Sequence, residues 1–156
     1  MSKAFTSEET PDEVVLGRPV VHVARGKERP ITLDGYRALV NEQEKLKATR
    51  LEEKDEAKRA QLDHRLAFLS ATLENVKVVN VPPPDGTVRF GSLVTLEWED
   101  GKRQTLRLVG VDEAHGVEAI SVESPLARVL MEQKEGDEVE VSRPRGVASA
   151  VLISVR

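Results

Sequence analysis

The sequence contains no cysteine among its 156 residues, which excludes disulfide bonds and thiolate chemistry. Aromatic residues make up only 3% of the chain, so few side chains can stack on bases or sugars and the core must be aliphatic. No apolar run approaches the roughly 18 residues of a membrane-spanning helix, and the acidic start, MSKAFTSEETPDE, lacks the apolar core of a secretory signal. We therefore expect a cytoplasmic protein with no membrane partner.

The sequence also has little of what catalysis or nucleic-acid coating requires. A net charge of −4 argues against a protein that coats nucleic acid with a basic surface. There is no phosphate-binding glycine loop and no serine nucleophile motif. His22, His64 and His115 lie far apart, without partners at the spacing of a helical zinc site. We expect no catalytic residue, no metal and no cofactor, and hence a protein that is not itself an enzyme.

Residues 33–76 carry the apolar periodicity of two helices. In the second half the apolar positions follow the heptad spacing of a coiled coil. These positions are Leu62, Leu66, Leu69, Leu73 and Val76. A weaker seam in the first half runs from Tyr36 to Arg50, and antiparallel folding would pair Leu39 with Leu73 and Arg50 with Leu62. The pattern predicts a helical hairpin with its turn near Glu56.

The expected turn, LEEKDEAKR at residues 51–59, contains neither glycine nor proline. The sequence therefore also permits one continuous helix that pairs with a second chain, although we favour the hairpin. Four carboxylates lie in this stretch: Glu52, Glu53, Asp55 and Glu56. Carboxylates at the end of a rod could hold a divalent cation, but a solvated turn is the favoured interpretation.

The first helix has a recognisable beginning. Thr32 is suited to be the N-cap, and Asp34 places a negative charge in the first turn, where the helix dipole favours it. Gly35 in the same turn costs about 1 kcal/mol relative to alanine. The basic cluster upstream, Arg25, Lys27 and Arg29, is interpreted as a solvated linker.

Three consecutive prolines, at residues 82–84, form a stiff linker and mark the strongest boundary in the chain. We predict a flexible or extended arm over 1–30, a coiled-coil hairpin over 31–81 and a small β domain over 82–156. Strands are expected at 87–90, 93–99, 104–111, 118–122, 138–142 and 147–155. Ser124 and Pro125 are expected to begin one short helix. The predicted fold class is α+β, with an antiparallel sheet.

Several blocks of the chain resemble the bacterial GreA/GreB transcript-cleavage factors. The blocks are ITLDGYRALVNE (31–42), LDHRLAFLSATLENVKVV (62–79), VRFGSLVTLEWEDG (88–101) and ISVESPLARVLMEQKEGDEVEV (120–141). The resemblance implies a coiled-coil hairpin followed by an FKBP-like domain. It also implies a monomer that binds RNA polymerase at the rim of the secondary channel and meets nucleic acid only indirectly, in the elongation complex. The family's docking segment corresponds to Glu123, Ser124 and Pro125.

The chain departs from the family at the end of the hairpin. The family presents two acidic residues of a D-x-x-E tip motif to the metal in the polymerase active site, and this motif is missing here. Relative to the family pattern the hairpin has lost roughly twenty residues, or on the order of 15 Å of reach at 1.5 Å per residue on each arm. The four acidic residues of the turn therefore do not inherit the catalytic role.

The resemblance thus leads us to expect a Gre-like regulator of transcription elongation that binds RNA polymerase without stimulating RNA cleavage. The alternative from a different class is a protein-interaction module that uses the FKBP-like domain and an intermolecular coiled coil.

Overall fold

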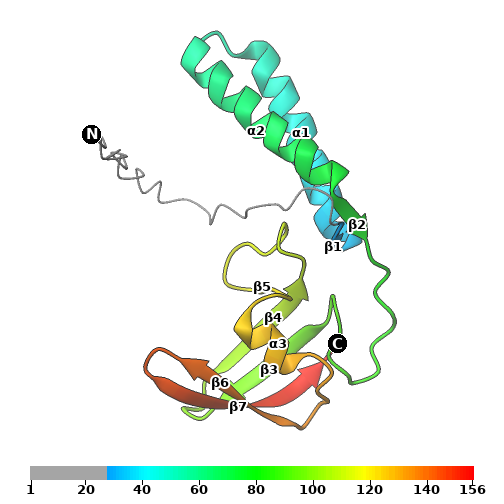
Figure 1. Ribbon diagram of the computed structural model, residues 1–156, viewed down its shortest axis with the longest axis vertical. Helices are drawn as coiled ribbons and strands as arrows, with labels where there is room; N and C mark the ends of the chain where they lie inside the picture. The colour runs from blue at the N-terminus through cyan, green and yellow to red at the C-terminus, as the bar shows by residue number, and fades with distance from the viewer. Residues whose placement is uncertain (1–27) are drawn as a thin grey trace, which may run out of the picture.

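A helical hairpin stands on a small β domain in the computed structural model, which describes residues 28–156 (Figure 1). The predicted arm lies almost entirely outside the described residues. In chain order the elements are β1 (Arg29–Ile31), α1 (Leu33–Glu52), α2 (Glu56–Glu74), β2 (Val76–Val78), β3 (Leu93–Trp98), β4 (Arg103–Val109), β5 (Ala119–Ser121), α3 (Pro125–Leu130), β6 (Glu138–Arg143) and β7 (Gly146–Val155). The α+β fold class is confirmed. Within residues 28–156, no helix is long and apolar enough to cross a membrane.

The two long helices pair within one chain, as the heptad pattern predicted. Thr32 is the N-cap of α1, and its side chain accepts a hydrogen bond from the Gly35 backbone N–H. Helix α1 ends at Glu52 and α2 begins at Glu56, so the connection lies close to the predicted turn. Leu39 and Leu69 are buried between the helices.

Polar side chains complete the helix interface. Gln43 Nε2 donates to Ser70 Oγ over 2.9 Å. Nearer the turn Arg50 pairs with Asp63 at 2.7 Å, so its partner is the residue next to the predicted Leu62. Charged residues can take these positions because this end of the hairpin is exposed to water.

A short parallel sheet closes the base of the hairpin. Strand β1 precedes α1, β2 follows α2, and Arg29 lies opposite Val76 in their register. Ile31 is completely buried here and packs with Leu39 and Leu69. The interpretation of Arg29 as part of a solvated linker is therefore wrong, because this residue belongs to a paired strand.

The β domain contains a five-stranded sheet in the order β5-β4-β3-β7-β6. The sheet was expected to be antiparallel throughout, but the edge strand β5 runs parallel to β4. The loop at residues 110–118 makes this possible, because it turns back far enough for β5 to begin beside Arg107 and run alongside the last residues of β4. The segment 87–90 is not a strand and forms one isolated bridge, between Thr87 and Lys134.

Helix α3 lies across the sheet and covers its aliphatic core (Figure 1). Ser124 is its N-cap and Pro125 its first residue, as predicted. The fully buried side chains of this core include Val88, Leu96, Leu108, Leu130 and Leu152.

Candidate functional site

The segment Glu123, Ser124 and Pro125 forms an ordered corner between β5 and α3. Ser124 Oγ accepts from the Ala127 backbone N–H at 3.2 Å, and Glu123 donates its backbone N–H to Ser121 Oγ at 3.1 Å. Ser124 is half-buried, whereas Glu123 and Pro125 are exposed. The corner therefore presents one carboxylate and one apolar ring on a backbone that hydrogen bonds hold in place.

The acidic residues at the tip of the hairpin divide into two pairs. Glu53 Oε1 accepts the backbone N–H groups of Lys54 and Asp55, both at 3.0 Å. Asp55 is the N-cap of α2, and Oδ1 accepts the backbone N–H of Lys58 at 3.1 Å. These hydrogen bonds build the tight turn without glycine or proline, since the two carboxylates satisfy backbone donors at the helix ends.

Glu52 and Glu56 form the other pair, and both side chains are exposed. Within the part of the chain that the structure describes, no group of three or more acidic, histidine or cysteine side chains could hold a metal ion. The tip lies at the end of the hairpin that points away from the β domain (Figure 1). The structure thus does not bring the tip residues and the Glu123 corner together.

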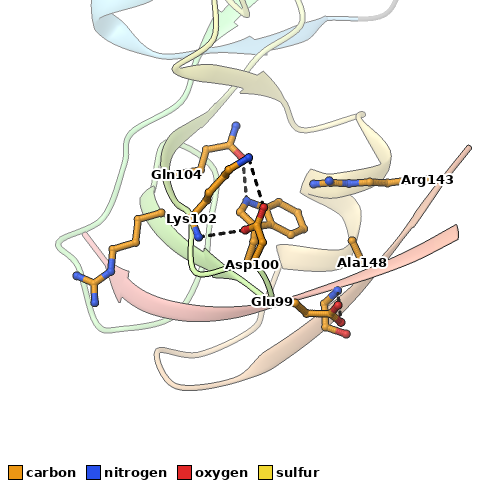
Figure 2. A pocket seen from close by; sticks show the side chains of 9 residues that line it. Glu99, Asp100, Lys102, Gln104, Arg143 and Ala148 are labelled. Atoms are coloured by element: carbon orange, nitrogen blue, oxygen red, sulfur yellow. Dashed lines mark hydrogen bonds and ion pairs between the residues drawn. The ribbon is translucent and has the colours of Figure 1, made fainter. Parts of the chain in front are cut away.

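A groove of about 480 Å³ lies between the β3–β4 turn and the β6–β7 strands (Figure 2). Arg143 stacks over the ring of Trp98, with its guanidinium carbon 4.0 Å from the ring centroid. Trp98 Nε1 donates to Gln104 Oε1 at 3.1 Å. At the turn the Lys102 backbone N–H donates to Asp100 and lowers the pKa of that carboxyl. Charged side chains flank the tryptophan, so the groove is not an apolar pocket.

A contact between the hairpin and the β domain was missed by the sequence analysis. Asp112 and Glu113 lie in the 110–118 loop and bind Arg29 and Thr32 at the base of the hairpin. We call these four residues the junction. The signal that could have indicated the junction is Gly35, an unfavourable residue for the first turn of a helix. A Cβ at this position would lie 2.5 Å from a carboxylate oxygen of Glu113.

Comparisons with known proteins place the C-terminal half in one family. Residues 83–156 match the family model described as "Transcription elongation factor, GreA/GreB, C-term". The chain is 42% identical over 98 residues to transcription elongation factor GreB of Pseudomonas putida, an alignment that covers 62% of this chain and 60% of the relative. It is 39% identical over 98 residues to GreB of Vibrio vulnificus, with 61% of each protein covered. The chain thus aligns with about three fifths of the length of these relatives.

Two solved structures are similar to this chain at low identity and low TM-score. GreA factor homolog 1 (Gfh1) of Thermus thermophilus is 20% identical with a TM-score of 0.41, covering 83% of this chain and 99% of the other. GreA/GreB from Nitrosomonas europaea is 24% identical with a TM-score of 0.42, covering 82% and 98%. The assignment depends on the sequence matches. Residues 83–156 match the GreA/GreB family of transcription elongation factors, and GreB proteins at about 40% identity support this match.

Proposed function

We propose that this protein regulates transcription elongation by docking on RNA polymerase at the rim of the secondary channel, without stimulating RNA cleavage. The match of residues 83–156 to the GreA/GreB C-terminal model is the observation that carries the proposal. The relatives at 42% and 39% identity are named transcription elongation factors. The protein would then act on the catalytic centre of the polymerase and have none of its own.

The Glu123 corner is the proposed docking element. Its ordered backbone suits recognition of a fixed surface, because little loop entropy is lost on binding, and its carboxylate is exposed to a partner. The helix that follows is anchored by the buried residues Ala127 and Leu130. The position of the corner is therefore fixed relative to the core of the β domain.

The hairpin tip supports the second half of the proposal. A helix of 20 residues such as α1 extends about 30 Å from its base. Two of the four tip carboxylates already hold the turn together. A bound metal ion requires several oxygen ligands in one compact set. Because Glu53 and Asp55 already accept backbone hydrogen bonds within the turn, we expect the hairpin to occupy the channel without positioning a metal ion.

The alternative of a coiled coil with a second chain would require α1 to exchange its partner. That exchange would break the Gln43–Ser70 hydrogen bond and the ion pairs of Arg50 with Asp63 and Arg65 with Glu42. These contacts within one chain support the monomeric hairpin, which is the form that we propose.

A competition assay tests the proposed function. Backtracked elongation complexes receive a fixed amount of a cleavage-active GreB, and this protein is titrated in. We expect RNA cleavage to fall as the protein rises, and the protein alone to add nothing to the intrinsic cleavage by the polymerase. Unchanged cleavage at high excess would contradict docking at the shared site.

A pair of charge reversals locates the docking element. Glu123→Lys should weaken the competition at least about tenfold, which corresponds to ~1.4 kcal/mol. Glu140→Lys makes the same change at an exposed position of the edge strand β6 and should compete like the parent protein. Equal loss in both variants would indicate a general charge effect and would count against the Glu123 corner.

A further inference from the structure

We propose that Asp112 and Glu113 are positioning residues that set the direction of the hairpin relative to the β domain. The covalent connection between the two parts is the segment at residues 79–92, which contains the three prolines. In Figure 1 the proline-containing part of this segment runs along the outside of the molecule, while the 110–118 loop reaches toward the hairpin base. The loop therefore provides a second, noncovalent connection.

Asp112 holds the first strand of the hairpin. Arg29 Nε donates to Asp112 Oδ2 at 2.7 Å and Arg29 Nη2 donates to Oδ1 at 3.2 Å. The side chains are only 12% and 6% exposed. A two-pronged, largely desolvated pair is directional, because the planar guanidinium and the carboxylate must lie in nearly one plane. The pair therefore restricts rotation of β1 against the loop.

Glu113 holds the first helix at its N-terminus. Its Oε2 accepts the Thr32 backbone N–H at 2.6 Å, and its Oε1 accepts the Thr32 hydroxyl. The same hydroxyl accepts the Gly35 backbone N–H at 3.0 Å. One carboxylate thus binds the N-cap residue twice, at the end of the helix where the dipole favours a negative charge.

Two glycines allow the surfaces to approach. A Cβ at Gly110 would lie 2.0 Å from the Pro30 carbonyl oxygen, and a Cβ at Gly35 would meet the Glu113 carboxylate. Neither position has room for a larger residue unless the backbone or the carboxylate moves. The approach of Gly110 to the Pro30 carbonyl does not depend on charge, so it supports the same arrangement independently of the ion pair.

The length of the hairpin amplifies any change at the junction. At 1.5 Å per residue, a rotation of about 10° at the base would move the tip roughly 5 Å. The loop and the proposed docking corner flank the same short strand, β5. A β domain held at its corner would therefore direct the hairpin tip to one place. This consequence for polymerase rests on the proposed function, whereas the positioning itself does not.

A distance measurement on the isolated protein tests the positioning. Because the chain has no cysteine, Leu51→Cys at the tip and Val151→Cys on β7 create two unique sites for spin labels. Both residues are exposed, at 80% and 37%. We expect one narrow distance distribution in the parent and a shifted or at least about twofold broader distribution after Asp112→Asn with Glu113→Gln. An unchanged narrow distribution in this variant would overturn the proposal.

Two further variants separate positioning from folding. Glu118→Gln, at an exposed position of the same loop, should leave the distribution unchanged. If the Asp112 and Glu113 changes reduce the helical circular dichroism, Gly110→Ala is measured instead, since it keeps every charge and pushes Pro30 away. A shift of the distance in Gly110→Ala supports the junction as the positioning contact, and an unchanged distance overturns it. Polymerase is absent throughout, so failure of docking cannot produce either result.

Discussion

Arg29 and Asp112 are separated by 83 positions in the sequence, yet their side chains meet at 2.7 Å across the junction. The pair joins the first strand of the hairpin to the loop before β5. Its neighbour Glu113 binds the residue that begins α1. The orientation of the hairpin thus depends on a small polar contact whose members can be changed one at a time.

Removal of Asp112 should destabilise the protein strongly. Asp112→Ala leaves the Arg29 guanidinium largely buried without its carboxylate, a change that typically costs about 3–5 kcal/mol. Urea unfolding followed by circular dichroism measures the loss. Asp85→Ala is the matched control, because it breaks an exposed pair with Arg89 and exposed pairs contribute little. If both variants lost a similar free energy of unfolding, burial of the Arg29–Asp112 pair would not explain its contribution to stability.

Thr32→Ala should weaken the start of α1. The change removes the N-cap oxygen and one donor to Glu113, and loss of an N-cap typically costs ~1 kcal/mol. Thr32→Ser keeps the hydroxyl and should retain most of the stability. Hydrogen exchange of the amides in the first turn of α1 checks the location of the effect, and equal exchange in the two variants would contradict it.

Gly35→Ala should be destabilising, although helix propensity alone predicts a gain of about 1 kcal/mol. The reason is the Glu113 carboxylate, which lies where the new methyl group would be. In a Glu113→Ala background the same change should become neutral or stabilising. A double-mutant cycle of unfolding free energies measures the coupling, and additive effects would show that the two residues do not interact.

The Arg50–Asp63 pair should make the stability of the hairpin depend on acid pH. The hydrogen bond from Arg50 holds the pKa of Asp63 below its ordinary value. A carboxyl with a lowered pKa in the folded state stabilises above its unfolded pKa, near 3.9, and this stabilisation is lost as the pH falls through the folded value. The effect should be small because both side chains are accessible to water, at 34% and 53% exposure.

An NMR titration of the Asp63 carboxyl measures that pKa directly. In Arg50→Met the pKa of Asp63 should rise toward the ordinary value, and the acid-dependent part of hairpin stability should shrink. Lys47→Met, also on α1 and exposed, is the control for loss of a positive charge. An equal rise in both variants would assign the shift to the general charge of the helix.

The tip itself can be tested by insertion. Replacing residues 51–59 with a full-length family hairpin end, including its acidic motif, should produce cleavage stimulation if docking and the hairpin direction are intact. The same insertion with its acidic residues changed to alanine should remain inactive. Failure of the acidic insertion in a variant that still competes with GreB would count against a correctly directed hairpin.

Features that depend on neighbours in sequence were predictable. Caps such as Thr32 and Ser124 act on backbone groups three residues away, and the heptad spacing of leucines follows from helix geometry. The turn near Glu56 was predicted from the antiparallel pairing of the two helical seams. The division at residues 30 and 81 and the docking role of Glu123, Ser124 and Pro125 stay predictions.

By itself, then, the sequence determined two helices, a β domain and the family blocks, because periodicity, caps and turn residues are local properties. Tertiary structure alone decided which side of β4 the strand β5 would join, and that Gly35 faces a carboxylate from a distant loop. It also decided that Arg29 is half of a buried pair. The contacts of Arg29 and Thr32 with the loop join residues more than 80 positions apart, and their energies depend on desolvation and direction, which no local pattern in the chain encodes.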